Sequence, residues 1–259
     1  MSIPQRKIML FDEPKMIESG IDIEDWDQHI YRIYPKKRFM ELLDTKTNVL
    51  VQPALWDDPM ENFFLNSLVK THDGELCSLE SIAAGWYGQC WTTKEESDAM
   101  WRIYSHDKNG VKVRTTVRKL FESFYDKGDS YRKLKYFVGK VSYQSRQEIE
   151  DFLSRVAFTD LALGGQADKF ARTLCIKRPE FDHEQEVRLL FQDAQNQHVD
   201  NKVIAFNLDH SLVFDEVVID PRIPENEFNV IKAELIEKGL SAAIKQSTLY
   251  EISKTIIKM

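Results

Sequence analysis

The stretch from Phe181 to Phe191 constrains this chain most, because it places charged side chains directly before an apolar run. Its sequence is Phe-Asp-His-Glu-Gln-Glu-Val-Arg-Leu-Leu-Phe. In a strand, side chains alternate between the two faces of the sheet, so Glu184, Glu186 and Arg188 would share one face. Two carboxylates this close repel each other unless a cation or a ligand lies between them. The pattern therefore predicts an active-site strand suited to carboxylate catalysis on a cationic or oxocarbenium-like centre.

The composition limits the class of protein and its partners. The chain has 259 residues, of which 42% are hydrophobic and 30% charged, and its formal net charge is −7. These values are typical of a globular protein with a substantial core, and the negative charge does not favour nucleic acid binding by the whole surface. Two local basic stripes could still bind a polyanion, and they consist of Lys112, Arg114, Arg118 and Lys119, and of Arg132, Lys133 and Lys135.

The cysteines and the apolar segments predict a location. Cys77, Cys90 and Cys175 are scattered and form no Cys-x-x-Cys pair, which favours a reducing compartment over a disulfide framework or a cysteine zinc site. No apolar run approaches the roughly 20 residues that span a bilayer. Residues 1–13 mix charged and apolar residues and do not resemble a signal peptide. We therefore expect a cytoplasmic protein with no membrane partner.

The order of expected elements predicts the fold class. No linker or repeat divides the chain, which indicates an N-terminal arm over residues 1–25 and a single α+β domain over 26–259. The segment 56–59 is expected to form a turn that begins a helix continuing through Leu68. Several strands are close enough for hairpins, so we expect one mixed, largely antiparallel sheet with flanking helices. The expected strands cover residues 29–34, 48–52, 89–93, 111–115, 134–143, 181–191, 203–206 and 216–220.

Several motifs follow one another in an order that resembles a known family. They are Ile30-Tyr31-Arg32, Trp56-Asp57-Asp58-Pro59-x-Glu61, Cys90-Trp91-Thr92, Asp98-x-Met100-Trp101-x-x-Tyr104, Gly110-Val111-Lys112, Lys177 with Glu184-x-Glu186-x-Arg188-Leu189, Val217-Val218-Ile219-Asp220-Pro221 and Ser247-x-Leu249-Tyr250. From about Asp27 to Tyr250 the chain is similar to the bacterial family catalogued as domain of unknown function 2971. Where members usually have Phe-Asn-Asp-Pro and Phe-Ser, this chain has Trp56-Asp57-Asp58-Pro59 and Trp91-Thr92.

The same motif order also resembles the ADP-ribosyltransferase fold, which has an early Arg or His, a middle Ser/Thr strand and a late Glu-x-Glu strand. The resemblance assigns Arg32 to the first position, Thr92 or Thr93 to the second, and Glu184 and Glu186 to the third. It implies an NAD-dependent ADP-ribosyltransferase-like enzyme, acting as a toxin or an antiphage defence effector. NAD would be the substrate, and the acceptor would be a protein, a nucleic acid or a small molecule. A neutralising partner chain would also be consistent with this role.

The resemblance implies a role for each candidate residue. Glu186 would stabilise the cationic sugar that forms as nicotinamide leaves, and Glu184 would position or deprotonate the acceptor. Arg32 would clamp a pyrophosphate while Tyr31 or Tyr34 stacks on a base. The predicted catalytic residues are Glu186, Glu184 and Arg32, and the predicted nucleotide-binding residues are Arg32, Tyr31, Tyr34, Thr92, Thr93, Trp101, Tyr104 and Arg188. No metal is required by this scheme.

Each motif also has a purely structural interpretation. The Glu184 and Glu186 face could be solvated with Arg188 pairing one carboxylate, and Trp101 could simply belong to the core. Lys177 and Arg178 could bind phosphate but are more typical of a solvated surface, and His183 would point away from Glu184. Two other function classes stay open. A nuclease-type toxin would bind Mg²⁺ through Asp57, Asp58, Glu184 and Glu186, and a non-enzymatic sensor would hold a nucleotide or a peptide.

Overall fold

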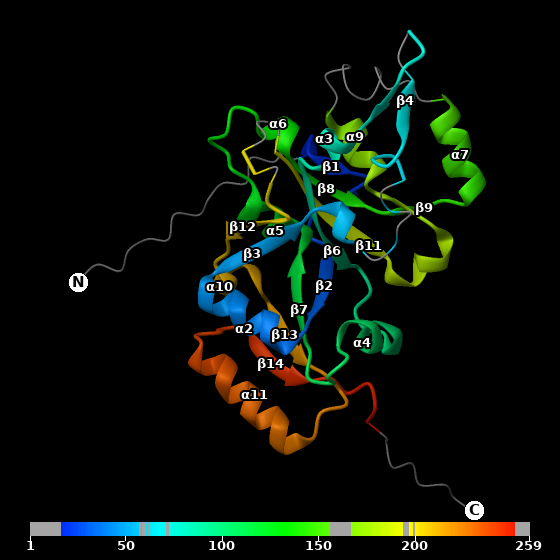
Figure 1. Ribbon diagram of the computed structural model, residues 1–259. Helices are drawn as coiled ribbons and strands as arrows, with labels where there is room; N and C mark the ends of the chain where they lie inside the picture. The colour runs from blue at the N-terminus through cyan, green and yellow to red at the C-terminus, as the bar shows by residue number, and fades with distance from the viewer. Residues whose placement is uncertain are drawn as a thin grey trace, which may run out of the picture.

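The computed structural model describes residues 17–56, 58, 61, 63–70, 73–155, 167–193, 197–198 and 200–251. A ten-stranded sheet runs through the molecule, with helices packed around it (Figure 1). Its strands are β1 (Gly20–Ile21), β2 (His29–Tyr34), β3 (Thr47–Val51), β6 (Trp86–Thr92), β7 (Val111–Thr116), β8 (Tyr136–Lys140), β11 (Glu186–Gln192), β12 (Val203–Asn207), β13 (Glu216–Ile219) and β14 (Ala243–Gln246). Two separate strand pairs are β4 (Leu68–Lys70) with β5 (Leu76–Ser78), and β9 (Ser142–Tyr143) with β10 (Ile176–Lys177).

The main sheet is mixed and mainly antiparallel. Its order is β1-β8-β11-β6-β2-β7-β13-β14, and β3 pairs with both β6 and β12 beside this path. Within this sheet, the pairs β1–β8 and β13–β14 are parallel, and the remaining described pairs are antiparallel. The predicted α+β class with a mixed, largely antiparallel sheet is therefore confirmed. The division into an arm and a single domain stays a prediction, although β1 of the expected arm already pairs with the sheet.

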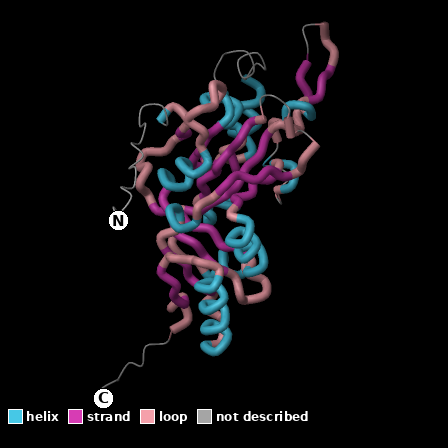
Figure 2. The backbone as a smooth tube through the Cα atoms, turned by 90° about the vertical axis from the view of Figure 1, so that its left-hand side faces the viewer, coloured by secondary structure: helices cyan, strands magenta, loops and turns pink. Residues whose placement is uncertain are grey.

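Helices cover the sheet, and the separate β4–β5 strand pair lies away from it (Figure 1). Helix α11 packs below β13 and β14, and the β4–β5 pair projects away from the rest of the molecule (Figures 1 and 2). None of the helices in the described part of the chain is long and apolar enough to cross a membrane. The helices are α2 (Lys36–Thr45), α3 (Glu80–Ala83), α4 (Asp98–Tyr104), α5 (Val117–Phe124), α6 (Arg132–Lys135), α7 (Arg146–Arg155), α9 (Ala167–Thr173), α10 (His210–Val213) and α11 (Glu225–Glu237), with 3₁₀ turns η1 (Pro53–Leu55) and η3 (Pro179–Glu184).

Apolar residues pack on both faces of β11. Val187, Leu189 and Phe191 belong to the larger buried cluster, whereas Leu190 belongs to a second cluster with Trp86. Because side chains alternate along a strand, Glu186 and Arg188 lie on the same face as Leu190. The predicted shared face of Glu186 and Arg188 is therefore correct, and the apolar run after them anchors the strand on both sides.

The predicted strand over residues 181–191 is wrong before Glu186. Pro179 begins the 3₁₀ turn η3, since its fixed φ suits the first position of a helical turn. Gln185 then has a φ of 43°, in the left-handed region, and ends this turn. Glu184 consequently enters the site from a turn and not from the strand. The helix expected to continue through Leu68 is also wrong at its end, because Leu68 lies in β4.

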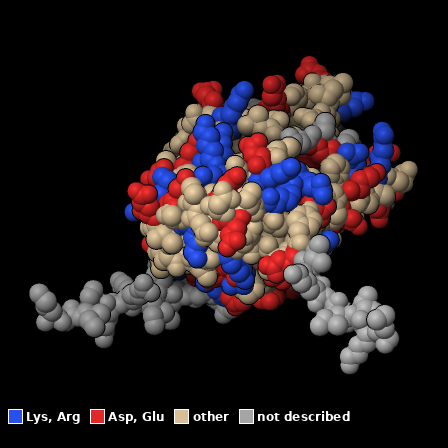
Figure 3. All heavy atoms as spheres, turned by 90° about the horizontal axis from the view of Figure 1, so that it is seen from below, with Lys and Arg blue, Asp and Glu red and all other residues tan. Residues whose placement is uncertain are grey.

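Six of the seven basic side chains in the two stripes form ion pairs with acids, and Arg132 donates to the Asp129 carbonyl at 3.2 Å. The face seen from below in Figure 3 shows basic and acidic side chains interspersed. This pairing offsets the positive charge, so neither stripe favours a polyanion. The ion pairs are Lys112–Glu96, Arg114–Glu216, Arg118–Asp27, Lys119–Asp215, Lys133–Glu18 and Lys135–Asp129.

We predict that Gly139→Ala destabilises the fold by about 1–3 kcal/mol, the usual cost of overpacking a close-packed site. A Cβ at Gly139 would lie 2.5 Å from the Cys175 sulfur and 3.1 Å from the Ile21 Cβ, inside the β1–β8 contact. Urea unfolding would measure the change in free energy. Gly128→Ala is the matched control, because a Cβ there meets only the Asp126 carboxylate at 3.3 Å. Equal effects of the two substitutions would contradict this packing argument.

Candidate functional site

A cavity of about 400 Å³ lies beside β6, where the neighbouring strands diverge. Strand β6 pairs with β11 along its whole length, but its other edge pairs with β3 only at Gly88 and with β2 only at Thr92. Between these two points, Gln89, Cys90 and Trp91 line the cavity. The volume falls within the range of small-molecule sites. The divergence of β2 and β3 from β6 therefore leaves room for a ligand at the centre of the sheet.

The cavity brings together most of the predicted catalytic and binding residues. Its walls come from strands β2, β3, β6, β10 and β11, helix α4 and turns η1 and η3. The predicted residues that line it are Tyr31, Arg32, Thr92, Tyr104, Glu184 and Glu186. These residues are far apart in the sequence, so only the folded sheet places them around one space.

Four predicted binding residues lie elsewhere. Tyr34 is buried in the main apolar cluster, and Trp101 is fully buried with its indole N–H donating to Glu96 at 2.8 Å. Thr93 and Arg188 are likewise absent from the described walls of the cavity. Tyr34 and Trp101 pack in the core and do not line the cavity. Arg188 pairs with Glu61 and Glu186.

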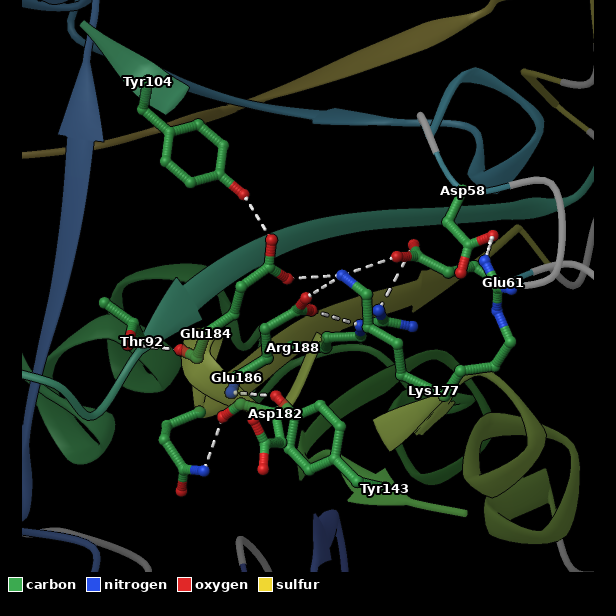
Figure 4. Close-up of polar contacts among 12 residues, drawn as sticks. Asp58, Glu61, Thr92, Tyr104, Tyr143, Lys177, Asp182, Glu184, Glu186 and Arg188 are labelled. Atoms are coloured by element: carbon green, nitrogen blue, oxygen red, sulfur yellow. Dashed lines mark hydrogen bonds and ion pairs between the residues drawn. The ribbon is translucent and has the colours of Figure 1, made fainter. Parts of the chain in front are cut away.

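Lys177 is the centre of a buried ionic cluster (Figure 4). Its Nζ lies 2.7 Å from Glu61 Oε1 and also contacts Glu184 Oε2 and Glu186 Oε1. All four side chains are at most 7% exposed, so the ammonium and the carboxylates face one another with little solvent between them. The sequence-based expectation of a solvated Lys177 is therefore wrong. Its position at the end of β10, beside β9, points the side chain inward.

Arg188 is the second cation of the cluster. Its Nε donates to Glu186 Oε2 at 2.8 Å, its Nη2 lies 3.2 Å from Glu61 Oε2, and its Nη1 donates to the Leu174 carbonyl at 2.6 Å. The guanidinium also lies 4.4 Å from the centre of the Trp56 ring. The interpretation in which Arg188 pairs one carboxylate is correct, but the carboxylates are buried and not solvated.

Hydrogen bonds to the main chain fix the position of Glu184. The Thr92 hydroxyl donates to the Glu184 carbonyl and accepts from the Lys94 N–H at 3.0 Å. The Thr93 N–H donates to the Gln185 carbonyl at 3.0 Å. The Thr92 hydroxyl, which was predicted to bind the nucleotide, therefore holds the turn that carries Glu184.

A tyrosine contacts the Glu184 carboxylate from the opposite wall. The Tyr104 hydroxyl donates to Glu184 Oε1 at 3.1 Å from helix α4, as Figure 4 shows. Burial and the Glu184 carboxylate raise the pKa of Tyr104, so its hydroxyl stays protonated and serves as a donor. Tyr143, on β9, accepts a hydrogen bond from the Glu186 N–H at 2.9 Å.

The two glutamates of the pair have opposite pKa shifts. Burial and the adjacent Glu186 carboxylate raise the pKa of Glu184 to about 7. Burial also opposes ionisation of Glu186, but the Arg188 and Lys177 charges outweigh it and hold the pKa of Glu186 well below its usual range. Near neutral pH, Glu186 is therefore ionised, whereas Glu184 is partly protonated.

Arg32 supplies a cation at another wall of the cavity. Its guanidinium lies 5.1 Å from the centre of the Tyr34 ring, and Nη1 donates to the Cys90 carbonyl. Its Nε is buried without a hydrogen-bond partner, and among the described residues no carboxylate lies within ion-pair distance. An anionic group entering the cavity would supply the missing counter-charge.

The positions or contacts of several site residues differ from those that the sequence predicts. Lys177 and Glu61 appear in the quoted motifs, yet no pattern indicated that they meet Glu184 and Glu186. His183 was expected on the far side from Glu184, but it also lines the cavity. Asp57 lies outside the described residues, whereas Asp58 lines the cavity and its carboxylate accepts from Arg178 at 2.9 Å.

The carboxylates are arranged around an ammonium group. Glu61, Glu184 and Glu186 all contact Lys177 Nζ, which occupies the position where a shared cation would bind. In the described ranges, no group of three or more His, Cys, Asp or Glu side chains has the arrangement of a metal site. The three carboxylates are thus already paired with a lysine of the chain itself.

Comparison with solved structures finds DarT of Thermus sp. 2.9. Its complex with NAD⁺ has a TM-score of 0.40 and 11% identity, covering 86% of this chain and 96% of that one. Its complex with ADP-ribosylated ssDNA has a TM-score of 0.40 and 10% identity, covering 85% and 94%. Its complex with carba-NAD⁺ has a TM-score of 0.39, 10% identity and coverage of 86% and 96%. No curated protein sequence matches the chain.

A family model matches the part of the chain that carries most of the ionic cluster. Residues 100–189 match the family described as "Protein of unknown function (DUF2971)". This range includes Tyr104, Lys177, Glu184, Glu186 and Arg188, whereas Arg32 and Glu61 lie before it. The resemblance to this family is therefore confirmed over residues 100–189, from helix α4 into strand β11, and it stays a prediction for the rest of the range 27–250.

Proposed function

We propose that this chain is an NAD-using ADP-ribosyltransferase-like enzyme whose active site is the cavity beside β6. The observation that carries the proposal is the convergence of Arg32, Tyr104, Glu184 and Glu186 on one cavity from separate elements. The cavity offers a cation for phosphate, aromatic walls for flat rings and two carboxylates with different protonation. These are the groups that cleavage of a nicotinamide–ribose bond requires.

Glu186 supports the bond-breaking step in this proposal. When nicotinamide leaves, it takes the electron pair of the glycosidic bond, and positive charge develops on the ribose. An ionised carboxylate close to that sugar stabilises the charge. Glu186 fits this role because its lowered pKa keeps it ionised at neutral pH, and because Lys177 and Arg188 fix both of its oxygens.

Glu184 supports transfer to the acceptor. A group whose pKa is near the working pH can take a proton from the attacking nucleophile, and the pKa of Glu184 is about 7. The contrast between Glu184 and Glu186 resembles other carboxylate pairs in which the environment separates the two roles. The acceptor would release its proton to Glu184 as its new bond to the ribose forms.

Arg32 and the aromatic walls support nucleotide binding. A guanidinium suits a pyrophosphate because its N–H groups form paired hydrogen bonds with phosphate oxygens. Tyr31 and Tyr104 both line the cavity, and in this proposal their rings contact a base or nicotinamide. The acceptor, the cytoplasmic location and the role as a toxin or antiphage effector stay predictions, as does a neutralising partner.

The two other function classes give different outcomes in simple assays. A Mg²⁺-dependent nuclease would lose activity with a chelator and would ignore NAD, although Lys177 occupies the centre of its supposed ligand set. A sensor would bind a nucleotide or a peptide tightly without turning it over. Nicotinamide release from NAD in the presence of a chelator would support the transferase against both.

We predict that Glu186→Gln lowers nicotinamide release from NAD by at least about 100-fold, the scale expected for a lost charge-stabilising group. The fold should persist, because Glu61 and Glu184 still balance Lys177 and Arg188. Kinetic assays and circular dichroism would measure the two effects. Glu237→Gln, at an exposed position of α11, is the control for removal of a carboxylate. Unchanged turnover by a folded Glu186→Gln protein would refute the role of Glu186.

We predict that Arg32→Lys raises the KM for NAD by about 10-fold with a smaller change in kcat. Lysine keeps the charge but loses the planar paired donors that match a pyrophosphate. Steady-state kinetics with NAD separates KM from kcat. Arg38→Lys is the control, since Arg38 is exposed on α2 and pairs only with Glu41 among the described residues. A loss confined to kcat would assign Arg32 to chemistry instead of phosphate binding.

We predict that nicotinamide release, with water as acceptor, increases with pH through about 7. Below that pH Glu184 holds a proton and cannot accept another, whereas above it the carboxylate is free to act as a base. Rates measured across this range should lose the dependence in Glu184→Gln. Persistence of the same pH dependence in Glu184→Gln would assign it to another group.

A further inference from the structure

Glu61 is a third buried carboxylate of the cluster, and the proposed reaction gives it no role. It comes from the segment before β4, far in the sequence from Glu184 and Glu186. Glu61 Oε1 is 2.7 Å from Lys177 Nζ, and Oε2 is 3.2 Å from Arg188 Nη2. It therefore contacts both cations on which the catalytic pair depends.

The charges of the cluster do not balance. When all groups are ionised, three carboxylates face two cations, so one negative charge lacks a partner. In a buried site this excess is relieved when one carboxylate takes up a proton. Glu61 and Glu186 each contact both Lys177 and Arg188, whereas Glu184 contacts Lys177 alone of the two. Geometry therefore makes Glu184 the carboxylate that holds the proton.

We infer that Glu61 is a positioning residue that sets the pH at which Glu184 becomes a base. By binding Lys177 and Arg188, Glu61 takes up positive charge that would otherwise stabilise the Glu184 carboxylate. This role rests on the proposed function of Glu184, but the charge coupling itself does not depend on any turnover. The substitution Glu61→Gln keeps the shape of the side chain and removes the negative charge that competes with Glu184 for the two cations.

The other groups around Glu184 leave this coupling intact near neutral pH. Burial raises the pKa of Tyr104, of Tyr143 and of Cys90, so all three stay protonated. His183 lines the same cavity, so a readout specific to the Glu184 carboxyl carbon is needed. The titratable or charged groups that line the cavity or contact the cluster are Arg32, Asp58, Glu61, Cys90, Tyr104, Tyr143, Cys175, Lys177, Arg178, His183, Glu186 and Arg188.

The test follows the Glu184 carboxyl carbon by NMR in the full chain labelled with ¹³C-glutamate. Loss of one signal in Glu184→Gln assigns it, and a pH titration gives its midpoint. The wild-type midpoint is expected near 7. In Glu61→Gln it should fall by about 1 pH unit or more, the size of shift that one adjacent charge produces. The rise of NAD cleavage with pH should move down by the same amount.

Two variants serve as matched controls. Glu180→Gln removes an exposed carboxylate from the same turn as Glu184, and should leave both the midpoint and the activity unchanged. Glu61→Asp keeps the negative charge, so its midpoint should stay nearer to the wild type than to Glu61→Gln. A Glu61→Asp midpoint as low as that of Glu61→Gln would contradict control by charge.

The outcomes separate this inference from the proposed function. A wild-type midpoint in the ordinary glutamate range of about 4.3, or an unchanged midpoint in Glu61→Gln, would overturn the inference even if NAD is cleaved. If Glu61→Gln does not fold, a wild-type midpoint in the ordinary glutamate range still overturns the inference. Conversely, a shifted midpoint in a protein that cannot cleave NAD would support the coupling and refute the transferase.

Discussion

The ammonium group of Lys177 holds the site together. It binds carboxylates from three separate segments, namely Glu61 before β4, Glu184 at the end of η3 and Glu186 at the start of β11. Without it, three buried carboxylates would repel one another, and Arg188 alone could not balance them. The positions of both catalytic candidates follow from this one interaction, and Arg188, which contacts Glu186 but not Glu184, makes their protonation differ.

The sheet makes the cavity by leaving β6 partly unpaired. On one edge β6 pairs fully with β11, which brings Glu186 opposite Thr92. On its other edge β2 and β3 each pair with it at a single residue and then diverge. Arg32 on β2 and Glu186 on β11 therefore face a common space from opposite sides of one strand. The helix α4 closes that space with Tyr104.

Much of the sheet and part of the site could be predicted from the sequence. Period-two alternation correctly places Glu186 and Arg188 on one face of the sheet. The apolar residues after them pack on both faces of β11 and hold it as a regular strand. The predicted strand begins too early, at residue 181 instead of Glu186, since no sequence pattern reveals that Gln185 has a positive φ. The sequence predicts Lys177 in solvent. Its burial depends on Glu61, which is distant in the sequence, and on Glu184 and Glu186, which lie across the turn η3. Long-range charge pairing leaves no periodic signal.

The most direct test of the account is a crystal structure with a non-cleavable NAD analogue. The account predicts the pyrophosphate against the Arg32 guanidinium and the nicotinamide-side ribose beside the Glu186 carboxylate, with Lys177 and Arg188 still bound to that carboxylate. An analogue bound outside the cavity, or one whose phosphates lie far from Arg32 and whose ribose lies far from Glu186, would contradict it.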